Sequence, residues 1–284
     1  MSLLGRMYDV LPACLKPVQF KIVESAQELQ AASRLVYREY LRRNYVRTNA
    51  AQMRLSLYQT LPTTVTFVAC HYRYGVVATA TLVQDSPLGL PMDEAYKTEL
   101  DGLRRRGLRV AEVTMLALDS EVFPRKTFTM FDPKKLLTTL RLFKVLFDYV
   151  RNSTTCDEMV ACFNPKHQIL YDFLRLTPLG GLKTYTGANG HPSIARHFNI
   201  QEAQRTGRSH VAYQLFYGRC SSARRFSRRL RLTANELRQL FMVQFPILQS
   251  ASPTELAYIK SCYPTYDFHA ILQPIPAISS VSVS

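Results

Sequence analysis

Residues 109–135, RVAEVTMLALDSEVFPRKTFTMFDPKK, form the stretch that decides the fold. The first half, RVAEVTMLALD, is an apolar run interrupted only by Glu112 and Thr114, which is typical of a strand buried on both faces. A carboxylate inside such a strand is costly unless it is paired or used, so Glu112 is a candidate functional residue. The second half leads into a helix that Asp132 is expected to cap and Pro133 to begin.

Strand and helix patterns alternate on both sides of this stretch. Upstream, the patterns predict a strand at 18–23, a helix from about 25 to 43 and a weaker helix around 52–60. A hairpin at 63–72 and 75–85 follows. Residues 86–107 are then expected to form an insertion with a short helix that acts as a lid. Downstream, they predict a helix at 134–152, a strand at 157–163, a helix after Asn164-Pro165 that Gly180-Gly181 breaks, and strands at 182–186 and 193–199. Hairpins mixed with crossover helices indicate an α/β or α+β fold with a mixed sheet.

The composition divides the chain into four parts. We expect a leader at 1–17, a folded domain at 18–200, a helical extension at 201–270 and a disordered tail at 271–284. The extension is rich in arginine, and Thr233 and Ser252 each begin a helical pattern within it. The tail carries no charge and two prolines.

The net charge of +15, from 36 basic and 21 acidic residues, fits either a solvated surface or an acidic partner such as nucleic acid, an anionic membrane or an acidic protein. The six cysteines include no CxxC pair, which favours reduced thiols in a cytoplasmic protein. The sequence contains neither a secretory apolar region nor a run long enough to span a bilayer. It also lacks GxGxxG, GxxxxGK[ST], HExxH and GxSxG motifs, so no dinucleotide, P-loop or metal site is predicted.

Four stretches carry a resemblance to a known family. They are SRLVYREYLRRNYV (33–46), SPLGLPMDEAY (86–96), AEVTMLALD (111–119) and NPKHQILYDFLRLTPLG (164–180). In these stretches the chain resembles the long-chain N-acyl amino acid synthases of the FeeM type. Those enzymes are relatives of the acyl-homoserine-lactone autoinducer synthases within the GNAT acyltransferase superfamily. The SPLGLP-type insertion is the most specific of the four, and the resemblance covers about residues 18–199.

The resemblance implies a mostly antiparallel central sheet flanked by helices in an acyltransferase domain. It also implies transfer of a long-chain fatty acyl group from a thioester to the amino group of an amino acid. The family often has Arg where this chain has Met115, and the lactone enzymes carry an N-terminal Trp, whereas this chain has none. These departures favour N-acyl amino acid synthesis, with lactone synthesis as the alternative.

Acyl transfer needs a base for the amine and a group that makes the thiolate a better leaving group. Glu112 is the candidate base, and a structural ion pair with an arginine such as Arg34 is the competing interpretation. By resemblance, Tyr171 matches the tyrosine that protonates the thiolate, although a core aromatic explains its spacing equally well. Arg34 and Tyr37 are candidates for binding the carboxylate of the amino acid.

The developing oxyanion also needs donors. In GNAT folds the central strand commonly bulges, and the resemblance places the freed backbone N–H groups near Met115 and Leu116, beside Thr114. These three residues are therefore expected to bind substrate. Asn164 is a further candidate, for a substrate or pantetheine amide, with helix capping as the competing explanation.

The identity of the acyl donor can be argued from the turn SEVFPRKTFTMFDP (120–133). Coenzyme A enzymes of the superfamily usually hold the pyrophosphate on a glycine-rich turn, and this turn has no glycine. The phosphopantetheine arm of acyl carrier protein has only one phosphate, so we predict acyl-phosphopantetheine as co-substrate and no bound cofactor.

Carrier proteins are strongly acidic, and the basic residues near the predicted site are docking candidates. They are Arg104, Arg105, Arg106, Arg125, Lys126, Lys134, Lys135, Arg141 and Lys144. A different class of function stays open, because the arginines at 219–231 fit an inactive protein that binds an anionic membrane or nucleic acid. Peripheral contact with the inner membrane is the more credible of these two, since the expected product is a lipid, and we do not expect nucleic acid as a partner.

Overall fold

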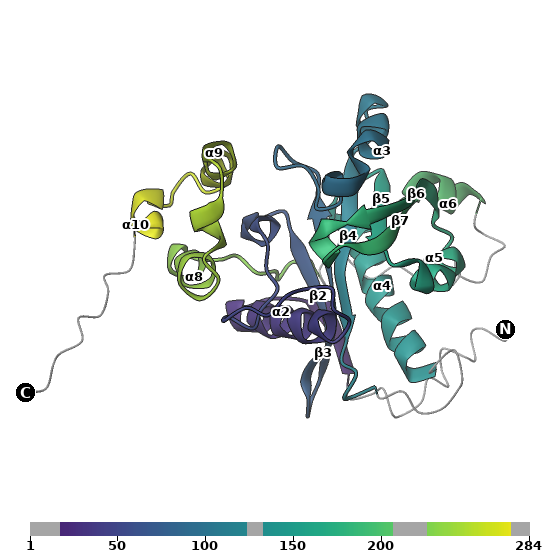
Figure 1. The fold of residues 1–284 in the computed structure, drawn as a ribbon, viewed down its shortest axis with the longest axis horizontal. Helices are drawn as coiled ribbons and strands as arrows, with labels where there is room; N and C mark the ends of the chain where they lie inside the picture. Colours follow the sequence, from purple (N-terminus) through teal and green to yellow (C-terminus); the bar gives the residue numbers. More distant parts are fainter. Residues whose placement is uncertain (1–17, 124–132, 207–225, 274–284) are drawn as a thin grey trace, which may run out of the picture.

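The computed structural model describes residues 18–123, 133–206 and 226–273 (Figure 1). The predicted leader, the helix cap at Asp132, the docking candidates Arg125 and Lys126, and the tail from residue 274 lie outside these ranges. Among the described residues, no helix is long and apolar enough to cross a membrane.

A seven-stranded sheet forms the centre of the molecule, in the order β1-β2-β3-β4-β5-β7-β6. The strands are β1 (Val18–Ile22), β2 (Val65–His71), β3 (Gly75–Gln84), β4 (Val110–Leu118), β5 (Glu158–Phe163), β6 (Thr177–Tyr185) and β7 (His191–Asn199). Every neighbouring pair is antiparallel except β4 and β5, which are joined by a crossover helix. This confirms the prediction of a mixed, mostly antiparallel sheet.

Helices cover both faces of this sheet (Figure 1). They are α2 (Ala26–Leu41), α3 (Asp93–Arg105), α4 (Pro133–Ser153), α5 (Gln168–Phe173) and α6 (Ile200–Thr206). The apolar stripe of α4, including Leu142, Phe143 and Leu146, packs with Phe67 and Ala111 on one face. Helix α2 lies on the opposite face, where its buried side chains pack against alternate residues of the same strands.

The C-terminal extension is helical, as predicted (Figure 1). It contains α8 (Ala234–Arg238), a π-helical turn (Gln239–Gln244), α9 (Pro253–Ser261) and α10 (Phe268–Leu272). Its apolar side chains share one core with the start of α2 and with β2. Residues 271 and 272 belong to α10, so the prediction that the tail begins at 271 is wrong at those positions.

Strand β4 contains a β-bulge where the pairing with β3 changes register. Thr79 pairs with Ala117 but Thr81 pairs with Thr114, so two residues, Met115 and Leu116, oppose Ala80 alone. The bulge also reverses the alternation of side chains. Ala111 and Val113 pack on the α4 face before it, whereas Leu116 and Leu118 do so after it.

Two local predictions were wrong for physical reasons. The expected helix at 52–60 is only a 3-10 turn at Leu57–Thr60. The pair Gly180-Gly181 does not break a helix, because α5 ends at Phe173 and both glycines lie within β6. A Cβ on Gly180 would stand 2.8 Å from the ring of Tyr96, so this glycine permits close packing of α3 on the sheet.

Candidate active site

The parallel strands β4 and β5 part shortly after they begin. They pair only from Val110 to Glu112, opposite Glu158 to Val160, although both strands continue further. Beyond Glu112, the described residues leave this edge of β4 without a neighbouring strand. An exposed strand edge offers backbone groups that can hydrogen-bond to an extended ligand with amide groups. We call this parting of β4 from β5, whose inner end is Glu112, the slot.

Glu112 is 1% exposed at this inner end. Its Oε2 accepts a hydrogen bond of 2.8 Å from the backbone N–H of Met92, and its carboxyl group also bonds to the side chain of Thr114. Burial raises the pKa of Glu112 to about 8, and nearby Asp93 adds to the rise, whereas the Met92 hydrogen bond opposes it. A carboxyl group with a pKa close to neutrality is suited to exchange a proton with an amine.

The motif SPLGLPMD shapes the loop that covers Glu112. Arg104 clamps both ends of the loop, with hydrogen bonds of 2.7–2.9 Å to the carboxylates of Asp85 and Asp93. Gly89 has a φ of +70°, and a Cβ there would stand 2.6 Å from Asp93 Oδ2. Leu90, Met92, Tyr96, Leu100 and Leu103 of this insertion are buried against the sheet. The insertion is therefore part of the packed core around Glu112.

The raised pKa of Glu112 predicts how stability depends on pH. The fold keeps a proton that the unfolded chain releases near the ordinary value of 4.5, so this contribution is complete below pH 4.5 and is lost as pH rises to about 8. Relative to Glu112→Gln, which cannot ionise, the wild type should lose roughly 3–5 kcal/mol of unfolding free energy across that window.

Urea unfolding of both proteins at about pH 5 and pH 9 measures this loss. Glu121→Gln is the matched control, because the side chain of Glu121 is 67% exposed. An equal pH dependence in the wild type and Glu112→Gln would mean that Glu112 is not buried as described.

Tyr171 lies against the slot from the α4 face of the sheet. Its ring stacks on Phe163 with centroids 3.5 Å apart and meets Phe143 edge to face. Burial raises the pKa of Tyr171, and the nearby Tyr40 and Cys162 add to the rise, so its phenol keeps its proton at neutral pH. Tyr171 is thus a core aromatic with a protonated phenol.

The bulge that the resemblance implies is present at Met115 and Leu116. Met115 adopts a φ of 52°, a left-handed conformation that is unusual for a residue with a side chain. Its side chain is held by Leu35 and Val36 of α2, and its Sδ accepts a hydrogen bond of 2.9 Å from Gln59. Such strained backbone is often found at functional sites, because the surrounding packing must hold it in place.

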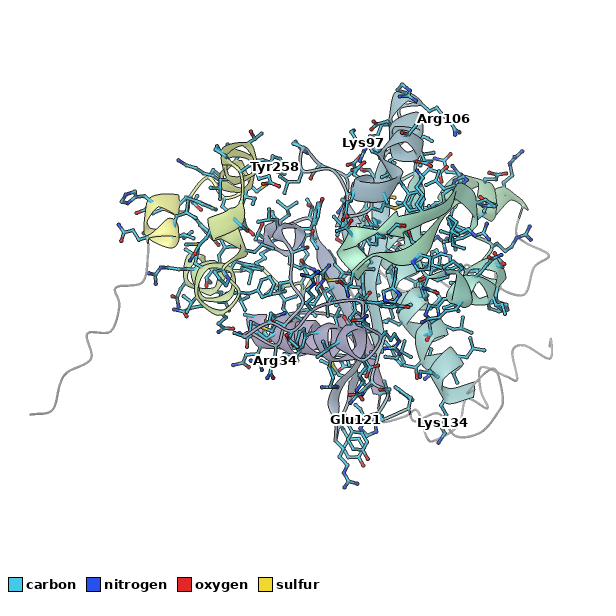
Figure 2. All side chains as sticks on the ribbon, in the orientation of Figure 1. Arg34, Lys97, Arg106, Glu121, Lys134 and Tyr258 are labelled. Carbon is cyan, nitrogen blue, oxygen red and sulfur yellow. The ribbon has the colours of Figure 1, made fainter. Side chains whose placement is uncertain are left out.

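The other predicted substrate residues, Arg34, Tyr37 and Asn164, form no hydrogen bond or ion pair with Glu112 among the described residues. Arg34 is exposed on the solvent side of α2 (Figure 2), and it forms no ion pair with the described residues. The proposed Arg34–Glu112 ion pair is therefore wrong. Tyr37 is buried, and its hydroxyl accepts a hydrogen bond of 3.2 Å from the N–H of Asn49. Asn164 caps the turn after β5, with its Oδ1 accepting from the N–H of Lys166.

Sequence reasoning missed two residues whose polar atoms have no partner in the described part of the chain. The Nε of Arg54 and the hydroxyl of Tyr45 are both buried without a hydrogen bond. Another nitrogen of Arg54 donates to the carbonyl of Gly187 at 2.9 Å. Arg54 also forms no ion pair with a described carboxylate, so its charge is left uncompensated. Buried polar groups are almost always satisfied, so we treat these two residues as further candidates for the site.

Arg54 and Glu112 both influence the hydroxyl of Tyr185. The charge of Arg54 acts on the hydroxyls of Tyr40 and Tyr185, opposing the rise in pKa that burial causes in both. Glu112 in turn adds to the raised pKa of Tyr185. The ring of Tyr45 meets Tyr40 edge to face at 5.7 Å. The site therefore combines one carboxyl group and one guanidinium, separated by tyrosines.

The predicted docking residues do not form one surface. Figure 2 shows Arg106 at the tip of α3 and Lys134 at the opposite end of the molecule. Arg105 and Arg106 are exposed, whereas Arg104 is engaged by carboxylates of the insertion, including Asp101 at 2.9 Å. Arg104 is thus a structural clamp, and we leave it out of the docking surface.

The remaining basic candidates lie on α4. Lys134 is exposed and Lys135 is half-buried at the N-terminal end of the helix. Further along, the guanidinium of Arg141 lies 5.8 Å from the ring centre of Phe20, and Lys144 pairs with Asp148 at 2.5 Å. Because α4 runs antiparallel to β4 and β5, its first turn borders the open end of the slot.

A mixed, mostly antiparallel sheet with a bulged β4 that parts from β5 is a GNAT-like fold. The structure of FeeM, an N-acyl amino acid synthase from uncultured soil microbes, is similar with a TM-score of 0.55 and 26% identity, covering 65% of this chain and 93% of that one. The acyl-homoserine-lactone synthase LasI is similar in fold, with a TM-score of 0.51 and 13% identity, covering 72% and 96%. A comparison with curated proteins found no match.

The family model for the N-acyl amino acid synthase FeeM matches residues 31–199, more than half of the chain. The chain belongs to the FeeM family of N-acyl amino acid synthases. The C-terminal extension lies outside this match.

Proposed function

We propose that the chain transfers a long-chain fatty acyl group from the thioester of acyl carrier protein to the amino group of an amino acid. The observation that carries this proposal is the buried Glu112 at the inner end of the slot, within three residues of the bulge at Met115. This arrangement provides a base and backbone donors on one strand, which acyl transfer to an amine requires.

The proposed reaction proceeds through a tetrahedral intermediate. The amine nitrogen attacks the thioester carbonyl carbon while ionised Glu112 takes a proton from the amine. The N–H groups of Met115 and Leu116 stabilise the oxyanion, and the C–S bond then breaks. The leaving thiolate takes a proton from Tyr171, which regains one from the solvent while Glu112 releases the proton it took, so the products are an amide and a free thiol.

We further propose that Arg54 binds the carboxylate of the acceptor amino acid. A guanidinium matches a carboxylate with two parallel hydrogen bonds, and an uncompensated buried charge favours an anionic ligand. Arg34 carried this role in the sequence-based hypothesis. Arg54 is the better candidate because it is half-buried and its charge acts on Tyr185, on which the charge of Glu112 also acts.

The proposed donor is acyl-phosphopantetheine attached to acyl carrier protein. The turn at 120–133 has no glycine to let backbone N–H groups approach a diphosphate. The basic first turn of α4 borders the open end of the slot, where an acidic carrier protein could dock and insert its arm.

Reconstitution tests the proposal directly. Purified protein is incubated with fatty acyl carrier protein or the same acyl coenzyme A, and with a mixture of amino acids, and mass spectrometry measures N-acyl amino acids. The expected result is product from the carrier-linked donor, with far less from the coenzyme A thioester. Formation of homoserine lactones, or of no amide at all, contradicts the proposal.

Charge reversal on α4 should weaken use of the carrier-linked donor. We expect Lys134→Glu/Lys135→Glu to raise the KM for acyl carrier protein about tenfold or more, with a larger effect at low salt. Arg105→Glu/Arg106→Glu is the matched control, because it reverses two exposed charges at the far end of the molecule. Equal KM values for the two variants would place the docking surface elsewhere.

A further inference from the structure

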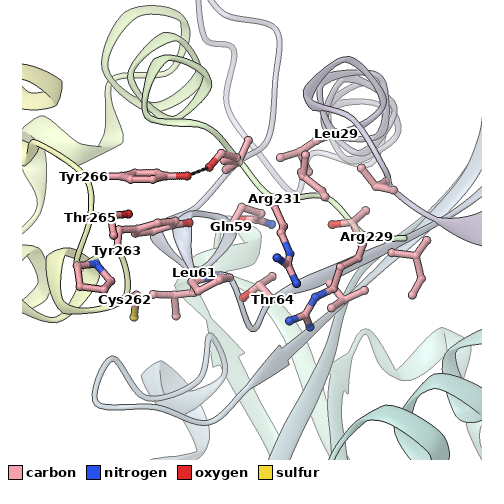
Figure 3. A pocket seen from close by; sticks show the side chains of 18 residues that line it. Leu29, Gln59, Leu61, Thr64, Arg229, Arg231, Cys262, Tyr263, Thr265 and Tyr266 are labelled. Atoms are coloured by element: carbon pink, nitrogen blue, oxygen red, sulfur yellow. Dashed lines mark hydrogen bonds between the residues drawn. The ribbon is translucent and has the colours of Figure 1, made fainter. Parts of the chain in front are cut away.

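A cavity of about 310 Å³ lies between the central sheet and the C-terminal extension (Figure 3). One side is formed by the end of β1, the start of α2 and the segment 59–66. The other side is formed by residues 229–232 and 262–266, which lie outside the family match. This cavity is separate from the slot between β4 and β5.

The walls of the cavity are mainly apolar. The apolar lining includes Ile22, Val23, Leu29, Leu61, Val65, Leu230, Leu232 and Tyr263. The volume is at the lower end of the range for small-molecule sites, so it suits one hydrocarbon chain and not the two chains of a bilayer lipid.

Two arginines give the cavity a positive charge. Figure 3 shows the guanidinium groups of Arg229 and Arg231 directed into the cavity beside Thr64. Arg229 is half-buried and donates a hydrogen bond to the hydroxyl of Tyr149 at 3.3 Å. None of the lining residues is Asp or Glu, and within the described ranges neither arginine forms an ion pair.

Thr64 adds an independent polar feature. Its hydroxyl is buried and has no hydrogen-bond partner among the described residues. A buried unpaired hydroxyl is unfavourable unless a ligand or water satisfies it. Two guanidinium groups therefore lie beside this hydroxyl at one place on a cavity whose walls are mainly apolar.

We propose that this cavity binds a single-chain amphiphile with a carboxylate head group. The carboxylate pairs with Arg229 and Arg231 and accepts a hydrogen bond from Thr64, while the hydrocarbon chain fills the apolar part. Free fatty acids and N-acyl amino acids share this chemistry. The inference does not rest on the proposed acyl transfer, because it uses none of the residues of the slot.

Photolabelling locates the site on the full chain. The probe is dodecanoate carrying a diazirine, and peptide mapping identifies the labelled residues. The expected result is label on peptides containing 59–66, 229–232 or 262–266. Label confined to peptides from β4, β5 and α5 overturns the proposal.

Variants and competitors test the charge requirement. Arg231→Gln should reduce labelling about tenfold, and the double variant with Arg229→Gln should reduce it further, because charge-assisted hydrogen bonds are lost. Arg231 is exposed, so the single variant should fold even if the change at Arg229 disturbs Tyr149. Arg228→Gln is the matched control, since Arg228 is exposed in the same segment but does not line the cavity.

Three unlabelled competitors separate the ligand classes. Dodecanoate or an N-dodecanoyl amino acid should displace the probe, and the stronger of the two identifies the source of the ligand. Dodecyltrimethylammonium has the same chain and the opposite charge, so it should compete poorly. Equal competition by all three, or unchanged labelling in Arg231→Gln and in the double variant, rules out a carboxylate site. Because acyl-transfer rates are measured separately, failure here is distinguishable from failure of the proposed function.

Discussion

Glu112→Gln is expected to lower kcat/KM for acyl transfer by about 10²- to 10⁴-fold, the usual contribution of a positioned general base. Gln keeps the size of the side chain and can still accept the hydrogen bond from the N–H of Met92, so the packing of the insertion should be preserved. What it removes is the ability to take a proton from the amine. Steady-state rates with saturating acyl donor measure the effect.

The pH dependence distinguishes a base from a structural residue. Since the base must be ionised and its pKa is about 8, ionisation of Glu112 should add a rise of about tenfold per pH unit to wild-type kcat/KM below that value, and above it only the dependence of the amine should remain. Glu112→Gln should lose this titration and keep only the dependence that arises from the amine. Glu121→Gln, on the exposed turn after β4, should behave as wild type. Wild-type activity in Glu112→Gln removes Glu112 from the mechanism.

Arg54→Gln is expected to raise the KM for the acceptor amino acid by about 10- to 100-fold, with a smaller effect on kcat. The reason is the loss of charge-assisted hydrogen bonds to the acceptor carboxylate. Arg34→Gln is the matched control, because it removes an exposed arginine from α2, and its KM should be unchanged. This pair of variants tests the structure-based assignment against the sequence-based one.

A second measurement makes the Arg54 prediction specific to the carboxylate. The wild type should prefer an amino acid over the amine formed by removing its carboxyl group, and Arg54→Gln should lose most of this preference. A variant that simply disturbs the loop would weaken both acceptors equally. An undiminished preference in Arg54→Gln shows that another group binds the carboxylate.

The central elements of the fold could be predicted from the sequence because their patterns are local. The apolar run of β4 and the helical period of α4 follow from neighbouring residues, and the carboxylate of Glu112 is conspicuous within an apolar strand. The bulge at Met115 and Leu116 could be predicted only from the family resemblance, since composition gives no sign of an extra residue in a strand.

Other features depend on contacts between distant residues. Arg104 belongs to a run of three arginines in the sequence, but in the folded insertion it forms ion pairs with Asp85 and Asp93. Arg54 and Tyr45 become site residues only because the turn after β6 closes over them, with Gly187 accepting from Arg54. Gly180 was interpreted as a helix breaker from the sequence, whereas in the structure it makes room for the ring of Tyr96. No single stretch of sequence contains these relationships.

The bulge separates what β4 does for packing from what it does for the site. Removing Met115 would restore regular pairing with β3, and Leu116 and Leu118 would stay on the α4 face of the sheet. The left-handed residue and its contacts with Leu35 and Val36 would be lost. A shorter β4 should therefore still pack but lack the site geometry, so homologous sequences that keep the activity should align through this strand without gaps.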